Sequence, residues 1–162
     1  MKEKTMRPEE KTALIFATGF GTGYSPLAPG TAGSLLAVLL FAGLSRLNIF
    51  LYLITLTVTF FIGIWSSDIA GRYYNDADSP RIVIDEILGI FITYIPLYFF
   101  AANILNIVSG FVLFRLFDIL KPFPANIANK IKRPLYVLLD DIIAAVYAAI
   151  ALLLLNIFMF KE

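Results

Sequence analysis

The sequence predicts an all-α fold: a polytopic membrane helical bundle forming a single domain over residues 1–162. Three observations predict it. Apolar residues make up 59% of the chain and the mean hydropathy is +0.82, which exceeds the usual range of soluble domains. The excess lies in long runs that are able to enter a bilayer. Charged residues gather where those runs begin and end.

The first part of the chain is polar and then rich in glycine. Residues 1–12 carry charges of both signs, so we expect a cytoplasmic segment and no signal peptide. Residues 13–34 form a glycine-rich region, in which we expect a short helix to about Thr18 and then a loop. The next helix should start near Pro29, because proline and a following hydroxyl residue favour a helix N-terminus.

About five membrane segments (four to five) follow from the apolar runs. The first run, 31–44, is short for a full span and is either tilted or extended by its loop. Polar connections occupy residues 66–84 and 121–138. The five runs are 31–44, 47–65, 87–102 with a break at Pro96, 104–120 and 142–160.

The distribution of basic residues supports this assignment of membrane segments. With the N-terminus inside, only Arg46 and Lys161 of the 13 basic residues fall on the outer side. Those on the inner side are Lys2, Lys4, Arg7, Lys11, Arg72, Arg81, Arg115, Lys121, Lys130, Lys132 and Arg133. The same assignment of membrane segments places acids from different helices at the cytoplasmic face.

Composition excludes several classes of chemistry. The chain has no cysteine and no histidine, so it has no disulfide framework, no thiolate zinc site and no cysteine or histidine nucleophile. The net charge of +1 gives no case for nucleic-acid binding. Hydrolytic chemistry would have to use carboxylates, hydroxyls, Lys, Arg, Tyr and a hard metal ion.

Five carboxylates stand at the ends of apolar runs: Asp85, Glu86, Asp118, Asp140 and Asp141. A carboxylate next to hydrocarbon costs a few kcal/mol unless it has a partner, a metal or water. Helix capping is the competing interpretation for Asp85–Glu86 and for Asp140–Asp141. Capping needs one acid of each pair, and the other could then point into the bundle.

Arg115, Asp118 and Lys121 are spaced i, i+3, i+6 and should share one helical stripe. They could form a local salt-bridge ladder near the membrane interface. Alternatively, Asp118 binds a metal while Arg115 and Lys121 hold an anion, a combination that suits phosphate.

A glycine-rich stretch from Gly19 to Ser34 precedes and opens a helix, where free backbone amides bind phosphate well. It matches neither a Walker loop nor a dinucleotide-binding fingerprint. A plain re-entrant loop is the competing interpretation. The phosphate-binding candidates in this stretch are Gly21, Thr22, Thr31 and Ser34.

Four segments together resemble the phosphatidylglycerophosphatase A family: the glycine-rich stretch 19–34, IVIDEILG at 82–89, FRLFDILKPFP at 114–124 and LDDIIAA at 139–145. The resemblance implies a Mg²⁺-dependent lipid phosphatase at the inner face of a bacterial cytoplasmic membrane. Its substrate would be phosphatidylglycerophosphate and its products phosphatidylglycerol and phosphate. The implied functional residues are Asp85, Glu86, Arg115, Asp118, Lys121, Asp140 and Asp141.

The chemistry of the residues agrees with that implication. We hypothesise that carboxylates from three helices hold one or two Mg²⁺ ions, which prefer oxygen ligands and would activate a water nucleophile. Direct attack by Asp118 or Asp140 through an acyl phosphate is the alternative. Arg115 and Lys121 would stabilise the negative charge that develops on the phosphate.

Two other function classes compete. A divalent-cation channel or carrier could use the same acids, but it would need carboxylates near the midplane of the bilayer. A transferase acting on CDP-activated lipids would also place acids near the cytoplasmic face, but its spaced D-G…A-R…G…D…D signature does not occur here.

Overall fold

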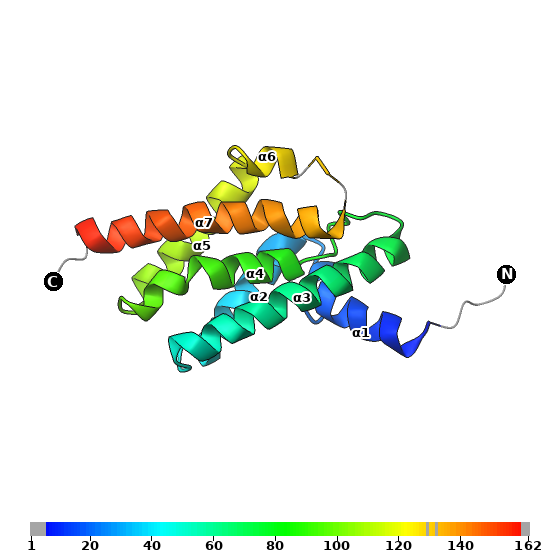
Figure 1. The fold of residues 1–162 in the computed structure, drawn as a ribbon, viewed down its shortest axis with the longest axis horizontal. Helices are drawn as coiled ribbons and strands as arrows, with labels where there is room; N and C mark the ends of the chain where they lie inside the picture. The colour runs from blue at the N-terminus through cyan, green and yellow to red at the C-terminus, as the bar shows by residue number, and fades with distance from the viewer. Residues whose placement is uncertain (1–5, 129, 132, 160–162) are drawn as a thin grey trace.

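The computed structural model describes residues 6–128, 130–131 and 133–159, and the described chain is helical without strands (Figure 1). Lys2, Lys4, Lys132 and Lys161 of the predicted charge pattern lie outside these residues. The elements are α1 (Pro8–Ala17), η1 (Thr22–Tyr24), α2 (Pro29–Leu44), α3 (Ile49–Tyr74), α4 (Ile84–Thr93), η2 (Ile95–Tyr98), α5 (Ile104–Leu120), α6 (Ala125–Ala128) and α7 (Pro134–Met159), where η marks short 3-10 helices.

The short helix α4 lies at the centre of the bundle. It packs against α2, α3, α5 and α7 (Figure 1). Most of its side chains are buried, including Ile87, Leu88 and Ile90. The chain leaves the α-helix after Thr93, and η2 follows with Pro96 in its first turn, where the missing amide is tolerated. The predicted break at Pro96 is therefore present.

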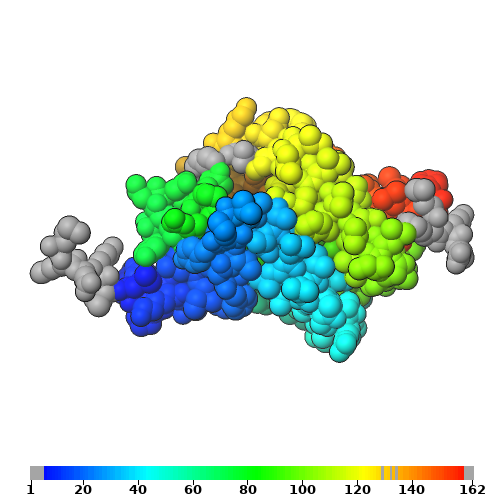
Figure 2. All heavy atoms as spheres, turned by 180° about the vertical axis from the view of Figure 1, so that it is seen from behind, coloured from blue at the N-terminus to red at the C-terminus, as the bar shows by residue number. Residues whose placement is uncertain are grey.

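The longer helices alternate in direction. In Figure 1, α2, α4 and α7 run from right to left, whereas α3 and α5 run from left to right. Seen from behind in Figure 2, the start of α2 lies between the loop that precedes α4 and the end of α5. Because of this alternation, the start of α4 can meet the end of α5 and the first turns of α7.

Two predicted boundaries are wrong, because each was drawn where hydropathy changes rather than where a helix can begin or end. Helix α3 continues nine residues past 65 to Tyr74, and its cap Asn75 adopts the left-handed conformation with φ of 56°. Helix α7 starts at Pro134 instead of 142, because proline suits the first helical position. Helix α1 starts at Pro8, so the last residues of the polar N-terminal segment are helical.

Two predicted boundaries agree with the structure. Helix α1 ends at Ala17 with Thr18 as its cap, and α2 begins at Pro29. Between them lie turns and η1, in which Gly19, Phe20 and Gly21 all have positive φ. The Gly21 φ of 98° is one that residues with a Cβ rarely adopt.

Two helices among the described residues are long and apolar enough to cross a membrane, Ile49–Tyr74 and Leu135–Phe158. Only 22% of the most apolar window of the first is buried, and side chains such as Phe50, Phe61 and Trp65 are exposed. A core helix of a soluble protein would bury most of that surface, so these faces suit lipid. The full set of five membrane segments stays a prediction.

Glycines allow the central helices to approach closely. A Cβ placed on Gly89 of α4 would lie 2.4 Å from the ring of Phe114 on α5, and one on Gly63 of α3 would lie 2.7 Å from Leu138 of α7. Small residues at helix crossings are typical of helix packing in membranes. These contacts fix α4 against α5, and α3 against α7, near the acidic side chains.

Candidate active site

The start of α4 carries the first two acids. Val83 precedes the helix, and Asp85 and Glu86 occupy its first turn, where the helix dipole favours negative charge. The Val83 amide donates a hydrogen bond to the Ala17 carbonyl oxygen (2.8 Å), and a Cβ on Gly33 would lie 2.7 Å from the Val83 side chain. The glycine-rich region therefore holds the start of α4 in place.

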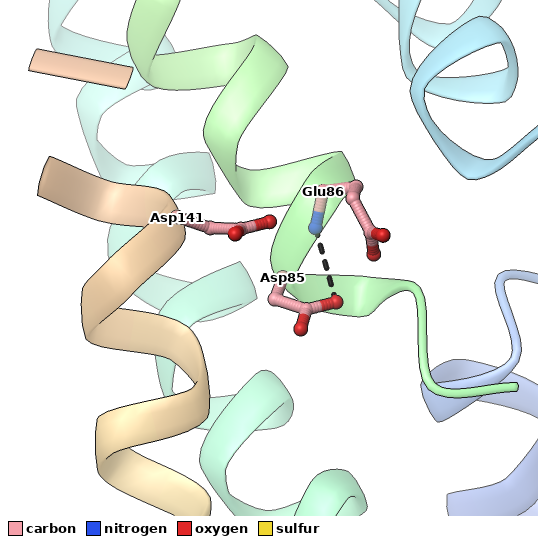
Figure 3. Close-up of side chains that lie close together, drawn as sticks. All are labelled: Asp85, Glu86 and Asp141. Carbon is pink, nitrogen blue, oxygen red and sulfur yellow. Dashed lines mark hydrogen bonds between the residues drawn. The ribbon is translucent and has the colours of Figure 1, made fainter. Parts of the chain in front are cut away.

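Helix α7 brings Asp141 to this turn (Figure 3). One carboxylate oxygen each from Asp85, Glu86 and Asp141 lies within 4.8 Å of the other two. The Asp85 carboxylate also accepts a hydrogen bond from the Glu86 amide (3.1 Å). Residues more than fifty positions apart in the sequence thus converge, as the predicted meeting of different helices requires.

Asp118 and Asp140 complete what we call the acidic cluster, which consists of Asp85, Glu86, Asp118, Asp140 and Asp141. Like-charge interactions reach Asp141 from Asp118, Asp85 and Asp140. Asp140 and Asp141 are each 4% exposed, and Asp85 and Asp118 are buried as well. Glu86 is half-buried as a residue, but its Oε2 is shielded from solvent.

Capping does not explain Asp140 and Asp141. Helix α7 begins at Pro134, so both acids lie almost two turns inside it, beyond the free amides of the helix end. The capping interpretation of this pair is wrong for that reason. Asp85 and Glu86 do stand in the first turn of α4, so their position agrees with the capping interpretation of that pair.

Two basic side chains pair with the cluster. Arg115 Nη1 lies 2.7 Å from Asp118 Oδ2, and both side chains are largely buried. Helix α5 ends at Leu120, and Lys121 turns out of it with φ of 43° and forms an ion pair with Asp140 of α7. Lys121 therefore does not continue the helical stripe that its spacing predicted, and its partner comes from another helix.

The surroundings of Lys121 keep it charged. Burial on its own lowers the pKa of the ammonium, but the hydrogen bond and charge of Asp140, with Asp141 and Asp118 nearby, outweigh burial and raise the pKa. Lys121 is thus a fixed positive charge beside the cluster.

The donor set fits a hard divalent cation. Five carboxylates face two ion-paired basic residues in the described chain, which leaves an excess of buried negative charge. Glu86 Oε2 and Asp140 Oδ1 are buried without a hydrogen-bond partner among the described residues. Free carboxylate oxygens from converging helices are the ligands that Mg²⁺ prefers.

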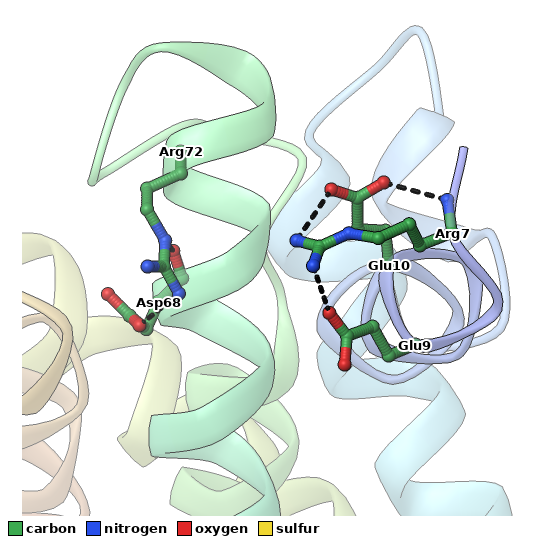
Figure 4. Close-up of polar contacts among 5 residues, drawn as sticks. All are labelled: Arg7, Glu9, Glu10, Asp68 and Arg72. Carbon is green, nitrogen blue, oxygen red and sulfur yellow. Dashed lines mark hydrogen bonds and ion pairs between the residues drawn. The ribbon is translucent and has the colours of Figure 1, made fainter. Parts of the chain in front are cut away.

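Two groups of exposed charges outside the cluster are paired locally (Figure 4). Asp68 pairs with Arg72 one turn away on α3 (2.5 Å), and Arg7 pairs with Glu9 and Glu10 at the start of α1. The Arg7 and Arg72 side chains are each 70% exposed. Exposed local pairs of this kind contribute little to stability and indicate no site.

The phosphate-binding candidates of the glycine-rich stretch lie at two places. Gly21 immediately precedes η1 and Thr22 is the first residue of η1, where the Thr22 hydroxyl donates to the Gly19 carbonyl oxygen (2.9 Å). Thr31 and Ser34 are in the first turns of α2, and the Ser34 hydroxyl donates to the Gly30 carbonyl oxygen (2.9 Å). Their role toward a phosphate stays a prediction.

Gly30 is the residue of this stretch with a described approach to the cluster, and it was not among the predicted site residues. A Cβ on Gly30 would lie 2.1 Å from Glu86 Oε1 and 3.4 Å from Arg115 Nη1. The signal in the sequence is a glycine at the second position of a helix. That signal alone does not reveal which side chain fills the space.

Comparison with known proteins extends this picture. Residues 15–156 match the phosphatidylglycerophosphatase A family. The chain is 34% identical to a protein named phosphatidylglycerophosphatase A from Haemophilus influenzae, over 90% of this chain and 89% of the relative. It is 32% identical to a protein of the same name from Escherichia coli, over 83% and 78% respectively.

A third relative carries a different name. The chain is 37% identical to a putative phosphatidylinositol-3-phosphatase from Bacteroides thetaiotaomicron, over 85% of this chain and 89% of the relative. No solved structure matches the chain.

Proposed function

The chain belongs to the phosphatidylglycerophosphatase A family, and we propose that it is a Mg²⁺-dependent lipid phosphatase that hydrolyses phosphatidylglycerophosphate to phosphatidylglycerol and phosphate in phospholipid biosynthesis. The observation that carries the proposal is the acidic cluster, with Arg115 and Lys121 at its edge. Carboxylates that bind a metal, placed beside fixed cations, suit a phosphomonoester.

Asp85, Glu86 and Asp141 would hold the metal, with Asp118 and Asp140 within reach of the same space. When bound, Mg²⁺ supplies positive charge that offsets the excess of carboxylates and polarises the phosphate. A resident cation would also explain why the cluster tolerates so many buried acids, because paired carboxylates repel each other otherwise.

The side chains of the site would bind the phosphate and transfer the proton. The Arg115 guanidinium and the Lys121 ammonium would donate hydrogen bonds to phosphate oxygens and stabilise the charge that develops there. A carboxylate of the cluster takes a proton from the attacking water, whose oxygen bonds to phosphorus as the bond to the glycerol oxygen breaks. That proton then neutralises the departing alkoxide.

Burial of the cluster supports this division of roles. Asp140 and Asp141 are shielded from bulk water, so the charges of Arg115 and Lys121 act in a medium of low dielectric. A preorganised arrangement of this kind stabilises a transition state without reorganising solvent.

We place the protein in a bacterial cytoplasmic membrane, with the site at the cytoplasmic face. The exposed apolar faces of α3 and α7 support insertion. Basic residues support the orientation, since Arg72, Arg81, Lys121 and Arg133 lie near the ends of helices that meet at the cluster and Arg46 lies in the α2–α3 turn at their opposite ends. A site at the membrane face suits a substrate whose acyl chains stay in the bilayer.

A second candidate substrate comes from the relative in Bacteroides thetaiotaomicron. Its name suggests that a related chain acts on an inositol phosphomonoester, whose phosphate sits on a secondary ring carbon. The same cluster could serve either headgroup, because both substrates are lipid phosphomonoesters. The cation channel or carrier finds no support in the names of these three relatives.

One assay tests the proposal and separates the two substrates. Purified protein in mixed micelles should release phosphate from phosphatidylglycerophosphate with Mg²⁺, and more slowly from phosphatidylinositol 3-phosphate. Faster release from the inositol lipid would reverse the substrate assignment. No release from either lipid, with Mg²⁺ flux in proteoliposomes, would favour the carrier.

A further inference from the structure

The first turn of α2 touches the acidic cluster at a residue without a side chain. Gly30 is the second residue of α2, and a Cβ built on it would lie 2.1 Å from Glu86 Oε1 and 3.1 Å from Glu86 Cδ. A Cβ essentially never lies within 3.0 Å of a heavy atom of another residue, so these contacts cannot be accommodated as they stand. The Glu86 carboxylate therefore occupies the space that any side chain at position 30 would need.

Backbone conformation does not require glycine at this position. Gly30 lies inside α2, and its φ is not in the left-handed region. Glycine is also a poorer helix former than alanine, so the helix itself would gain from a substitution. What the glycine provides is room for Glu86.

The other contacts of the Glu86 carboxylate are with charged side chains. Its Oε2 is buried without a hydrogen-bond partner among the described residues. It shares a side-chain hydrogen bond with Asp85 and lies close to Asp141, carboxylates that repel it unless a cation or a proton intervenes, and Gly30 and the Arg115 guanidinium lie next to it. Its place in the cluster thus depends on the space at Gly30 and on charge.

We propose that Gly30 is a positioning residue that admits the Glu86 carboxylate into the metal-binding cluster. The inference rests on the proposed function, because it assumes that Glu86 is a metal ligand. A methyl group at position 30 displaces the far end of a flexible side chain and leaves the backbone alone. The consequence is a folded protein with a misplaced ligand.

The test is Mn²⁺ binding to the purified protein in detergent, followed through the electron paramagnetic resonance signal of free Mn²⁺. We expect Gly30→Ala to weaken binding by about tenfold, the loss typical of a disturbed ligand support. Gly43→Ala is the matched control in the same helix, because a Cβ there meets no atom within 4 Å. It should bind Mn²⁺ as the unaltered protein does.

A double-mutant cycle with Glu86→Asp separates positioning from general damage. The aspartate side chain is one methylene shorter and leaves room for a Cβ at position 30. We therefore expect Gly30→Ala to weaken Mn²⁺ binding much less in the Glu86→Asp protein than in the unaltered one, because residues in contact are not additive. Thermal melting in detergent should show that Gly30→Ala stays folded.

Three results would count against the inference in different ways. Unchanged Mn²⁺ affinity in Gly30→Ala would overturn the role of Gly30 alone. An equal loss with and without Glu86→Asp would show that Gly30 acts through something other than Glu86, which also overturns it. An unaltered protein that binds no Mn²⁺ would overturn the metal site, and with it the proposed function.

Discussion

Asp141 shows at the scale of single residues why the site needs a cation. It is 4% exposed, and its carboxylate has three acidic neighbours in Asp85, Asp118 and Asp140. A lone buried acid can be neutralised by a proton. Several buried carboxylates beside only two described basic side chains, Arg115 and Lys121, leave a concentration of negative charge, which suits a divalent cation with oxygen ligands. These carboxylates come from α4, α5 and α7.

Arg115 gives the first prediction at this scale. Arg115→Lys keeps the charge but loses the planar pair of donors that matches phosphate. We expect turnover to fall by about tenfold, equivalent to about 1.4 kcal/mol of transition-state stabilisation. Steady-state phosphate release in mixed micelles measures it.

Arg72→Lys is the matched control, because Arg72 forms an exposed ion pair with Asp68 away from the cluster. It should leave turnover unchanged. Equal losses in the two variants would mean that Arg115 has no special relation to the substrate.

That acids from different helices converge could be predicted from the sequence, but their individual partners could not. Acids at the ends of apolar runs can be recognised in the sequence, because a carboxylate next to hydrocarbon costs free energy. That Lys121 pairs with Asp140 depends on the left-handed turn at the end of α5, and that Glu86 meets Gly30 depends on how α2 crosses α4. Neither follows from spacing along one helix.

At the scale of elements, α4 is held by close contacts that tolerate no added volume. Gly89 lies against Phe114, which is fully buried. This contact sets the distance between α4, with Asp85 and Glu86, and α5, with Asp118.

We expect Gly89→Ala to destabilise the protein by about 1–3 kcal/mol, because the aromatic ring cannot move without disturbing a packed core. Unfolding in detergent by thermal melting measures the change. Gly43→Ala again serves as the control and should melt no lower than the unaltered protein, since alanine favours the helix. Equal melting of the Gly89 and Gly43 variants would contradict the packing argument.

Boundaries were predicted well where a residue dictates them and poorly where hydropathy was used. Pro29 opens α2 as predicted, and Pro96 marks the end of α4. Pro134 could have marked the start of α7 by the same rule, but the boundary was drawn at Ile142, where the apolar run begins. The error mattered, because it placed Asp140 and Asp141 at a helix end and invited the capping interpretation.

At the scale of the whole molecule, the alternating directions of α2, α3, α4, α5 and α7 explain how acids distant in sequence reach one place (Figure 1). They also connect the site to the proposed orientation in the membrane. If the chain crosses the membrane five times with the cluster on the cytoplasmic side, the α2–α3 turn lies on the periplasmic side.

The chain has no cysteine, so single reporter cysteines can test this orientation. We expect Gly43→Cys, near the α2–α3 turn, to react with a membrane-impermeant maleimide in spheroplasts. Asp76→Cys, in the exposed loop after α3, should react only after permeabilisation. The reverse pattern would invert the orientation, and labelling of both from outside would contradict a full span by α3.

The most direct test of the central claim is the dependence of phosphate release on Mg²⁺ in the unaltered protein and in Asp85→Asn, Asp118→Asn and Asp141→Asn. Phosphatidylglycerophosphate is the substrate, and Asp76→Asn, an exposed loop variant, is the control. We predict saturable activation by Mg²⁺ in the unaltered and control proteins, with loss on chelation and recovery on readdition. The three cluster variants should insert normally and release no phosphate at any Mg²⁺ concentration. Turnover that survives chelation, or near-normal turnover in all three variants, would contradict the claim that these carboxylates form a metal site for phosphate hydrolysis.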